Sequence, residues 1–233
     1  MQVMIQLETF APLTHAAVLA IAGLLPIVDP LGSIPIYQQL TTRIGRGQQA
    51  AMARAVAFDT FLLLLASTLV GAYVLDFFGL SIPTVQVGGG LMVCALAWTL
   101  LTKPDTDDAA RASALEMSAD ELPRRAFYPL TMPVTVGPGS LSVAVTLGAN
   151  QGSDVRGLVV TAAGHAAGIL AVAVAVYLCY RYADTILSWL GNTGRTVLMR
   201  LSAFITLCIG VQIVWNGAHQ LLAVAFPGLT GHN

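Results

Sequence analysis

The sequence predicts an all-α membrane protein with six transmembrane helices in a 3+3 inverted repeat, the first and fourth helices being broken at Pro/Gly motifs. Composition is the first of three observations behind this prediction. Of 233 residues, 56% are hydrophobic and 10% are charged, whereas soluble domains carry about 25% charged residues. Several apolar runs reach about 20 residues, the length of a membrane-crossing helix. The other two observations are a duplicated motif and a one-sided distribution of basic residues.

The first motif, PIVDPLGSIP, occupies residues 26–35 within an apolar segment at 13–40. Pro30 and Pro35 lack the N–H groups that would bond carbonyls one turn earlier. Asp29 precedes a proline and is therefore pushed away from helical geometry, while Gly32 adds backbone freedom. In lipid, unpaired backbone groups are costly unless protein, water or a bound solute meets them. The motif therefore predicts a broken helix that lines a cavity.

A second motif, PVTVGPGSLS at residues 133–142, repeats the order of proline, five residues and Gly-Ser. A second match links Phe78-Gly79 and the helix that follows to Leu190-Gly191 and its following helix. Two matches in the same order predict an internal duplication. With three spans in each copy, the second half would insert upside down, which is a transporter architecture.

The spans follow in order from these signals. Gly45 and Gly47 turn the chain between the first two spans, residues 76–82 form a short loop, and Pro83 opens the third span. Residues 103–125 are the only hydrophilic run and are expected to form a solvated cytoplasmic loop. The expected spans are residues 13–40, 52–75, 83–101, 127–147, 157–180 and 196–226. They make one transmembrane domain over residues 1–233, with repeat one at 11–101, the loop at 102–125 and repeat two at 126–226.

Basic residues test this order of spans. Six spans place on one side Arg43, Arg46, Arg54, Lys103, Arg111, Arg124, Arg125, Arg181, Arg195 and Arg200, and leave only Arg156 on the other. Cytoplasmic loops of membrane proteins carry the excess of Lys and Arg. The distribution therefore predicts that both termini lie on the periplasmic side.

Ser33 and Ser140 stand just past the two motifs, as N-caps of new half-helices would. Unpaired amides and the positive dipole end at such a position can bind an anion such as a carboxylate. The alternative is that the prolines and glycines only kink two helices for packing. Two breaks at corresponding places favour a binding site.

Asp29 lies inside the first motif, where the second has Val136. An ionisable residue at membrane depth is costly and is often functional. Asp29 could hold a substrate ammonium or a coupling cation, or carry a proton. It could equally hydrogen-bond the amides of Gly32 and Ser33 and only stabilise the bend.

Polar residues also occur outside the motifs. Asp59 and His165 lie about two turns into the second and fifth spans, where a proton relay is one interpretation, and pairing of Asp59 with Arg54 or simple solvation is another. Gln212, Asn216 and His219 share one helix face in the sixth span. We expect that face to point into the bundle for interhelical hydrogen bonds, with pathway lining as the alternative.

No catalytic or metal-binding constellation emerges. The sequence lacks H-E-x-x-H, G-x-S-x-G, a P-loop and paired-carboxylate spacing. An enzyme is therefore not expected, nor a cofactor, a metal or a nucleic-acid partner. The expected partners are the lipid bilayer and a small solute, with a homo-oligomer left open.

Particular residues resemble the MarC family of membrane proteins over all six spans. They are Asp29-Pro30-Leu31-Gly32 with Pro35, then Pro129-Leu130, Pro133 and Gly137-Pro138-Gly139, then Gly191, Gly194, Arg200, Gln212 and Gly217. The resemblance implies a 3+3 inverted fold in the bacterial inner membrane, related to LysE-type exporters and to membrane thiol-reductant conduits. It also implies transport of small neutral amino acids such as alanine and glycine. The conduits place reactive cysteines at the helix breaks, and because this chain has none there, that activity does not carry over.

The two lines of reasoning combine in one hypothesis, alternating-access transport of a small neutral amino acid with a midplane site at the two breaks. The hypothesis leaves open whether the transport is export and whether it is coupled to protons or to sodium ions. Asp29 or carbonyls near Val136 would take the ammonium. The expected substrate-binding residues are Asp29, Gly32, Ser33, Thr135, Gly137, Gly139 and Ser140. The alternatives are an exporter of another small metabolite or drug, and a non-transporting membrane scaffold.

Overall fold

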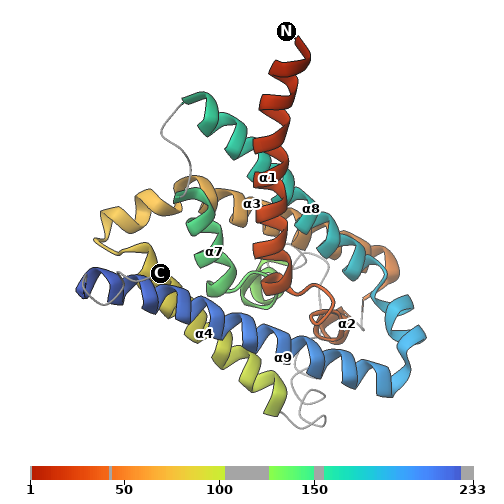
Figure 1. Cartoon of the computed structure of the whole chain (residues 1–233). Coiled ribbons are helices and arrows are strands. Elements are labelled where there is room, and N and C mark those ends of the chain that lie inside the picture. The colour runs from red at the N-terminus through yellow and green to blue at the C-terminus, as the bar shows by residue number, and fades with distance from the viewer. Residues whose placement is uncertain (1, 42–43, 103–125, 150–154, 227–233) are drawn as a thin grey trace.

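The computed structural model describes residues 2–41, 44–102, 126–149 and 155–226, and all regular elements within them are helices (Figure 1). The prediction of an all-α fold is therefore confirmed. The expected cytoplasmic loop falls mostly outside the described residues. In chain order the elements are α1 (Gln2–Val28), α2 (Ile34–Thr41), α3 (Arg46–Phe77), α4 (Ile82–Thr102), η2 (Ala126–Thr135), α7 (Pro138–Ala149), α8 (Val155–Arg181) and α9 (Ala183–Ala225).

Within the described ranges, four helical segments are long and apolar enough to cross a membrane, namely Arg46–Phe77, Ile82–Thr102, Gly157–Arg181 and Thr196–Ala225. Two shorter apolar helices, Pro12–Val28 and Pro138–Ala149, adjoin the predicted breaks. Large apolar side chains cover the outside of the bundle, with Trp189 88% and Phe77 85% exposed. Apolar exposure on this scale suits contact with lipid rather than water.

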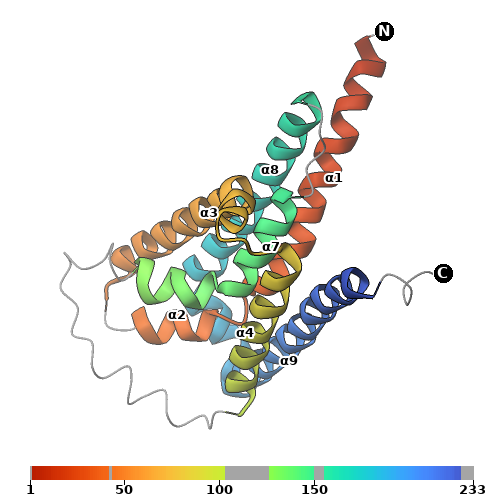
Figure 2. The same ribbon diagram turned by 90° about the vertical axis from the view of Figure 1, so that its left-hand side faces the viewer.

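The helices pack in pairs. Both views show α4 running beside α9, and α1 beside α8 (Figure 1, Figure 2). The buried apolar core lies among α1, α2, α3, η2, α7 and α8 and includes Leu24, Ile34, Val56, Leu64, Leu130, Val136, Ile169 and Val176. Val28 and Ile34, which flank the first break, and Leu130 and Val136 of the second are buried in this core.

Small residues set the close approach of α8 to α1. A Cβ added at Gly164 would lie 2.5 Å from the carbonyl oxygen of Leu13, and one at Gly168 would lie 2.5 Å from that of Ala17. Membrane helices approach this closely where small residues are spaced four apart on one face. The two glycines therefore serve helix packing.

We expect Gly168→Leu to lower the free energy of unfolding by about 3 kcal/mol or more, because the larger side chain would force α8 away from α1. Gly157→Leu is the matched control, since a Cβ at Gly157 meets nothing within 4 Å. Reversible unfolding of the detergent-solubilised protein, followed by circular dichroism, measures both changes. Equal effects of the two substitutions would contradict the packing role of Gly168.

Several helix boundaries differ from the sequence-based expectation. Helix α1 continues through Pro26 to Val28, so the first break begins at Asp29. Residues 183–195, which lie between the expected fifth and sixth spans, belong to α9, and Gly191 (φ 64°, ψ −178°) is its one non-helical residue. A glycine adopts this left-handed φ without steric cost, so helix can continue on both sides of the kink.

Candidate functional site

The first break is closed by the chain itself. The N–H of Asp29 donates to the Leu25 carbonyl (3.0 Å), and Asp29 then turns to φ +42°, the one positive φ of a non-glycine residue in the described chain. Its Oδ1 accepts a hydrogen bond from the N–H of Gly32 (3.0 Å), while the N–H of Ser33 donates to the Asp29 carbonyl (3.1 Å). The Asp29 carboxylate therefore caps the turn into α2, a contact worth about 1 kcal/mol.

The bond to the Gly32 amide is the contact expected if Asp29 only stabilises the bend. The amides of Gly32 and Ser33, which were candidates for binding a substrate carboxylate, are thus engaged by the Asp29 carboxylate and the Asp29 carbonyl, respectively. Ser33 does hold the position before α2, and its carbonyl accepts from the N–H of Tyr37 (3.0 Å).

Helix α9 holds the first break from the other side. The Ser202 side chain lies near the Asp29 carboxylate. A Cβ at Gly32 would collide with that carboxylate and lie 2.6 Å from the Cβ of Ser202. Only glycine allows the break and α9 to approach this closely.

The second break begins earlier than the motif predicts. Within η2, Tyr128 (φ −127°, ψ 123°) and Met132 (φ −118°, ψ 121°) are extended rather than helical. Both precede a proline, which disfavours helical geometry in the preceding residue. The N–H of Val136 donates to the carbonyl of Thr131 (2.7 Å), five residues back. The fourth span, expected to begin near residue 127 and to break at residues 133–142, is therefore already irregular from Ala126.

Helix α7 starts at Pro138, so Ser140 is its third residue and not its N-cap. The Ser140 hydroxyl donates to the Gly137 carbonyl (2.9 Å), which also accepts from the N–H of Leu141 (3.1 Å). The N–H groups of Gly139 and Ser140 lie in the first turn, where a helix offers no carbonyl one turn earlier. They are the donors at the positive end of α7.

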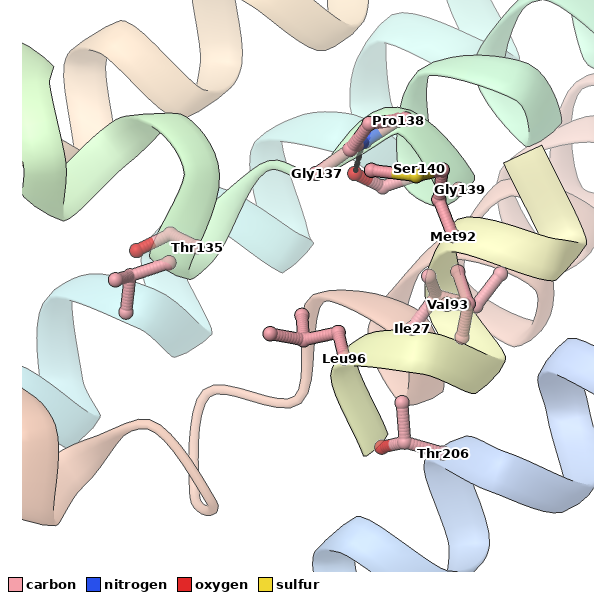
Figure 3. A pocket seen from close by; sticks show the side chains of 11 residues that line it. Ile27, Met92, Val93, Leu96, Thr135, Gly137, Pro138, Gly139, Ser140 and Thr206 are labelled. Atoms are coloured by element: carbon pink, nitrogen blue, oxygen red, sulfur yellow. Dashed lines mark hydrogen bonds between the residues drawn. The ribbon is translucent and has the colours of Figure 1, made fainter. Parts of the chain in front are cut away.

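A pocket of about 40 Å³ opens at this first turn. Figure 3 shows the apolar side chains of α4 and Ile27 between the turn at residues 137–140 and Thr206 of α9. Such a volume holds a few water molecules or a solute of few atoms. The lining residues are Ile27, Met92, Val93, Leu96, Val134, Thr135, Gly137, Pro138, Gly139, Ser140 and Thr206.

Tyr180 of α8 lies between the two breaks. Its side chain is 2% exposed, its hydroxyl lies 2.8 Å from Oγ1 of Thr135 in η2, and the buried Ser33 side chain of the first break lies close to that hydroxyl. The Thr135 hydroxyl donates to the Leu130 carbonyl (2.7 Å). Because a hydroxyl has one hydrogen, Tyr180 must donate to Thr135. The Tyr180 hydroxyl therefore binds α8 to the second break, beside Ser33 of the first.

The Tyr180 ring also stacks on Tyr37 of α2, with centroids 4.3 Å apart and planes inclined by 13°. Offset stacking of buried aromatic rings adds about 1 kcal/mol beyond burial. Sequence reasoning missed Tyr180. Its position at the end of an apolar run, just before Arg181, is typical of an aromatic residue at the membrane interface.

The two candidate coupling residues lie in different surroundings. Asp59 of α3 is partly exposed and lies near the Thr131 side chain of η2 in the second broken segment, while Arg54 is exposed. His165 of α8 is 4% exposed, and its Nδ1 has no hydrogen-bond partner in the described chain. A proton relay through these residues stays a prediction.

Comparison with known proteins decides the family. The model of the MarC family of integral membrane proteins matches residues 14–222, which include both breaks and Tyr180. The chain belongs to the MarC family. It is 27% identical over 209 residues to the inner membrane protein MarC of Salmonella arizonae, with 88% of this chain and 94% of that protein covered. The MarC proteins of Salmonella typhimurium and Escherichia coli are each 26% identical over the same length and coverage. No solved structure matches the chain.

In this MarC-family chain the expected interior stripe of α9 is wrong. Gln212, Asn216 and His219 are exposed, and Gln212 donates to Oδ1 of Asn216 (2.9 Å) on the same surface. The face of α9 that packs inward carries the small or apolar side chains of Ala203, Thr206, Gly210, Ile213 and Gly217. A polar stripe marks one face of a helix, but the packing of α9 against α4 decides which face is buried.

The interhelical polar contact instead involves Gln86 of α4, which sequence reasoning missed. Gln86 is 8% exposed and donates to the hydroxyl of Thr146 in α7 (3.1 Å). Its Oε1 also accepts from Gln220 of α9 (3.4 Å). Gln86 thus hydrogen-bonds α4 to both α7, the helix after the second break, and α9.

Proposed function

We propose that this MarC-family chain is an inner membrane transporter for small neutral amino acids of the glycine and alanine class. It would work by alternating access, with its substrate site at the two helix breaks. One observation carries the proposal: the Tyr180 hydroxyl is hydrogen-bonded to Thr135, which lines the pocket of the second break, and lies beside Ser33 of the first. Broken helices that meet at a cavity bind solutes in many transporters.

The proposal includes a 3+3 inverted repeat with both termini on the periplasmic side. Gly79 and Gly191, which match in the two halves of the sequence, are the two glycines of positive φ in the described chain (66° and 64°). Helix α2, after the first break, packs on α9, and α7, after the second, packs on α4. If α2 corresponds to α7 and α4 to α9, each helix that follows a break packs on the last helix of the other half, as a two-fold relation between the halves requires. The basic residues support the orientation.

The donors and acceptors suit a zwitterion. The first-turn amides of Gly139 and Ser140, which line the pocket, would take a carboxylate. Asp29 of the first break would take the ammonium. Asp29 lies outside the pocket lining, and Ser202 of α9 stands between the two, because its side chain lies near Asp29 and its carbonyl accepts from the Thr206 hydroxyl (2.9 Å) in the pocket wall. The small pocket leaves little room for a side chain.

Counterflow tests the proposal. Proteoliposomes preloaded with unlabelled glycine or alanine should take up the labelled amino acid faster than empty liposomes, whatever the coupling ion. Asp29→Asn should lose most of this uptake because the amide keeps the cap on Gly32 but removes the charge that holds the ammonium.

Folding of the Asp29→Asn protein is checked by its elution as one species in gel filtration. Absence of uptake by well-folded wild-type protein would contradict amino-acid transport. Preloading with other metabolites would then separate a carrier of another solute from a scaffold, which moves none.

A further inference from the structure

A second cavity, of about 200 Å³, lies where the start of α3 meets the junction of α8 and α9. Its lining differs from that of the pocket at the first turn of α7, here called the break pocket, because it contains charged side chains where the break pocket has mostly apolar ones. The lining residues are Arg46, Gln49, Ala50, Arg181, Tyr182, Asp184 and Thr185.

The cavity brings together charges of both signs. Arg46 begins α3 and Arg181 ends α8, and neither has an ion-pair partner in the part of the chain that the structure describes. The Arg181 guanidinium lies 5.7 Å from the ring centroid of Tyr182. Asp184 in the first turn of α9 accepts a hydrogen bond from Gln38 of α2 (3.0 Å). Guanidinium groups bind carboxylates in a planar fork, and a carboxylate binds an ammonium.

Two stacked aromatic rings connect a residue in the lining of this cavity to one in the lining of the break pocket. Tyr37 donates from its hydroxyl to the carbonyl of Gln49 (2.6 Å), a residue that lines the cavity. The Tyr37 ring stacks on Tyr180, whose hydroxyl lies 2.8 Å from Oγ1 of Thr135 in the wall of the break pocket. Each step from one cavity to the other is a direct contact between named residues.

We propose that the charged cavity is a loading site for the transported zwitterion, closed off from the break pocket by the stacked rings of Tyr37 and Tyr180. This inference rests on the proposed function for its substrate class. Arg46 and Arg181 hold the carboxylate, and Asp184 holds the ammonium. Both arginines belong to the basic side of the chain, so the loading site faces the cytoplasm.

Glycine binding in a background that disables the break site tests the loading site by itself. Purified Asp29→Asn protein in detergent should bind labelled glycine, and adding Arg181→Gln or Asp184→Asn should weaken this binding about tenfold, as loss of one charge-assisted hydrogen bond does. Arg54→Gln is the matched control, because Arg54 is exposed on α3 outside the cavity lining. Unlabelled glycine should compete, whereas acetate and methylamine, each with one of the two charges, should compete poorly.

The outcomes separate the two proposals. Wild-type counterflow with no glycine binding to Asp29→Asn overturns the loading site and leaves the transporter. Glycine binding that depends on Arg181 and Asp184, without wild-type counterflow, overturns transport and leaves the site. Acetate competing as well as glycine overturns the zwitterion and indicates an anion site. Partial recovery with Arg181→Lys shows that loss in Arg181→Gln comes from the charge and not from misfolding.

Discussion

Tyr180→Phe is expected to raise the initial rate of glycine counterflow about fivefold and to lower the free energy of unfolding by about 1–2 kcal/mol. Phenylalanine keeps the ring stacked on Tyr37 but removes the hydroxyl that bonds Thr135 beside Ser33. That hydroxyl holds α8 to the second break in the described arrangement, which the proposed alternating access would require the protein to leave. Weakening the link therefore lowers both the stability of this state and the barrier to its exchange.

Tyr177→Phe is the matched control, because Tyr177 lies one turn earlier on α8, is half-buried and packs against the apolar core. Thermal unfolding of the purified protein and counterflow in proteoliposomes give the two readouts. A slower rate for Tyr180→Phe, with Tyr177→Phe unchanged, would mean that the hydroxyl serves the substrate rather than the link. Unchanged stability would mean that the hydrogen bond of this hydroxyl contributes nothing to the fold.

Gly32→Ala is expected to lower the free energy of unfolding by about 2–3 kcal/mol and to abolish counterflow. The added Cβ would collide with the Asp29 carboxylate and approach the Cβ of Ser202 within 2.6 Å. To relieve the clash, Asp29 must release either the Gly32 amide or α9, so the first break loses its cap or its attachment to α9. Either loss acts at the proposed site of the ammonium group.

Gly88→Ala provides the comparison, since a Cβ at Gly88 meets nothing within 4 Å and the residue lies within α4. Alanine is the better helix former by about 1 kcal/mol, so this change should raise stability slightly and leave transport intact. Urea titration followed by tryptophan fluorescence compares the two proteins. If both substitutions shift the midpoint in the same direction, the steric argument for Gly32 is wrong.

The helix breaks could be predicted from the sequence because their causes are local. Pro30 removes a backbone donor, and the prolines after Tyr128 and Met132 restrict the residues before them, whatever the rest of the chain does. The lengths of the apolar runs are also local properties of the sequence. The membrane-length helices of the structure confirm the multi-span membrane protein that those lengths predicted. The capping of Gly32 by Asp29 was also within reach, as one of two interpretations of a carboxylate beside unpaired amides.

The contacts between distant segments depended on the tertiary structure. The sequence could not show that Tyr180 meets Ser33 and Thr135, that Gln86 rather than Gln212 is buried, or that Arg46 and Arg181 share a cavity. These facts follow from how far each helix is rotated about its axis and how closely it approaches its neighbours. Small residues such as Gly168 and Gly32 set those distances by contacts with other helices. The periodicity of a helix records which residues share a face, but only packing against partners decides where that face points.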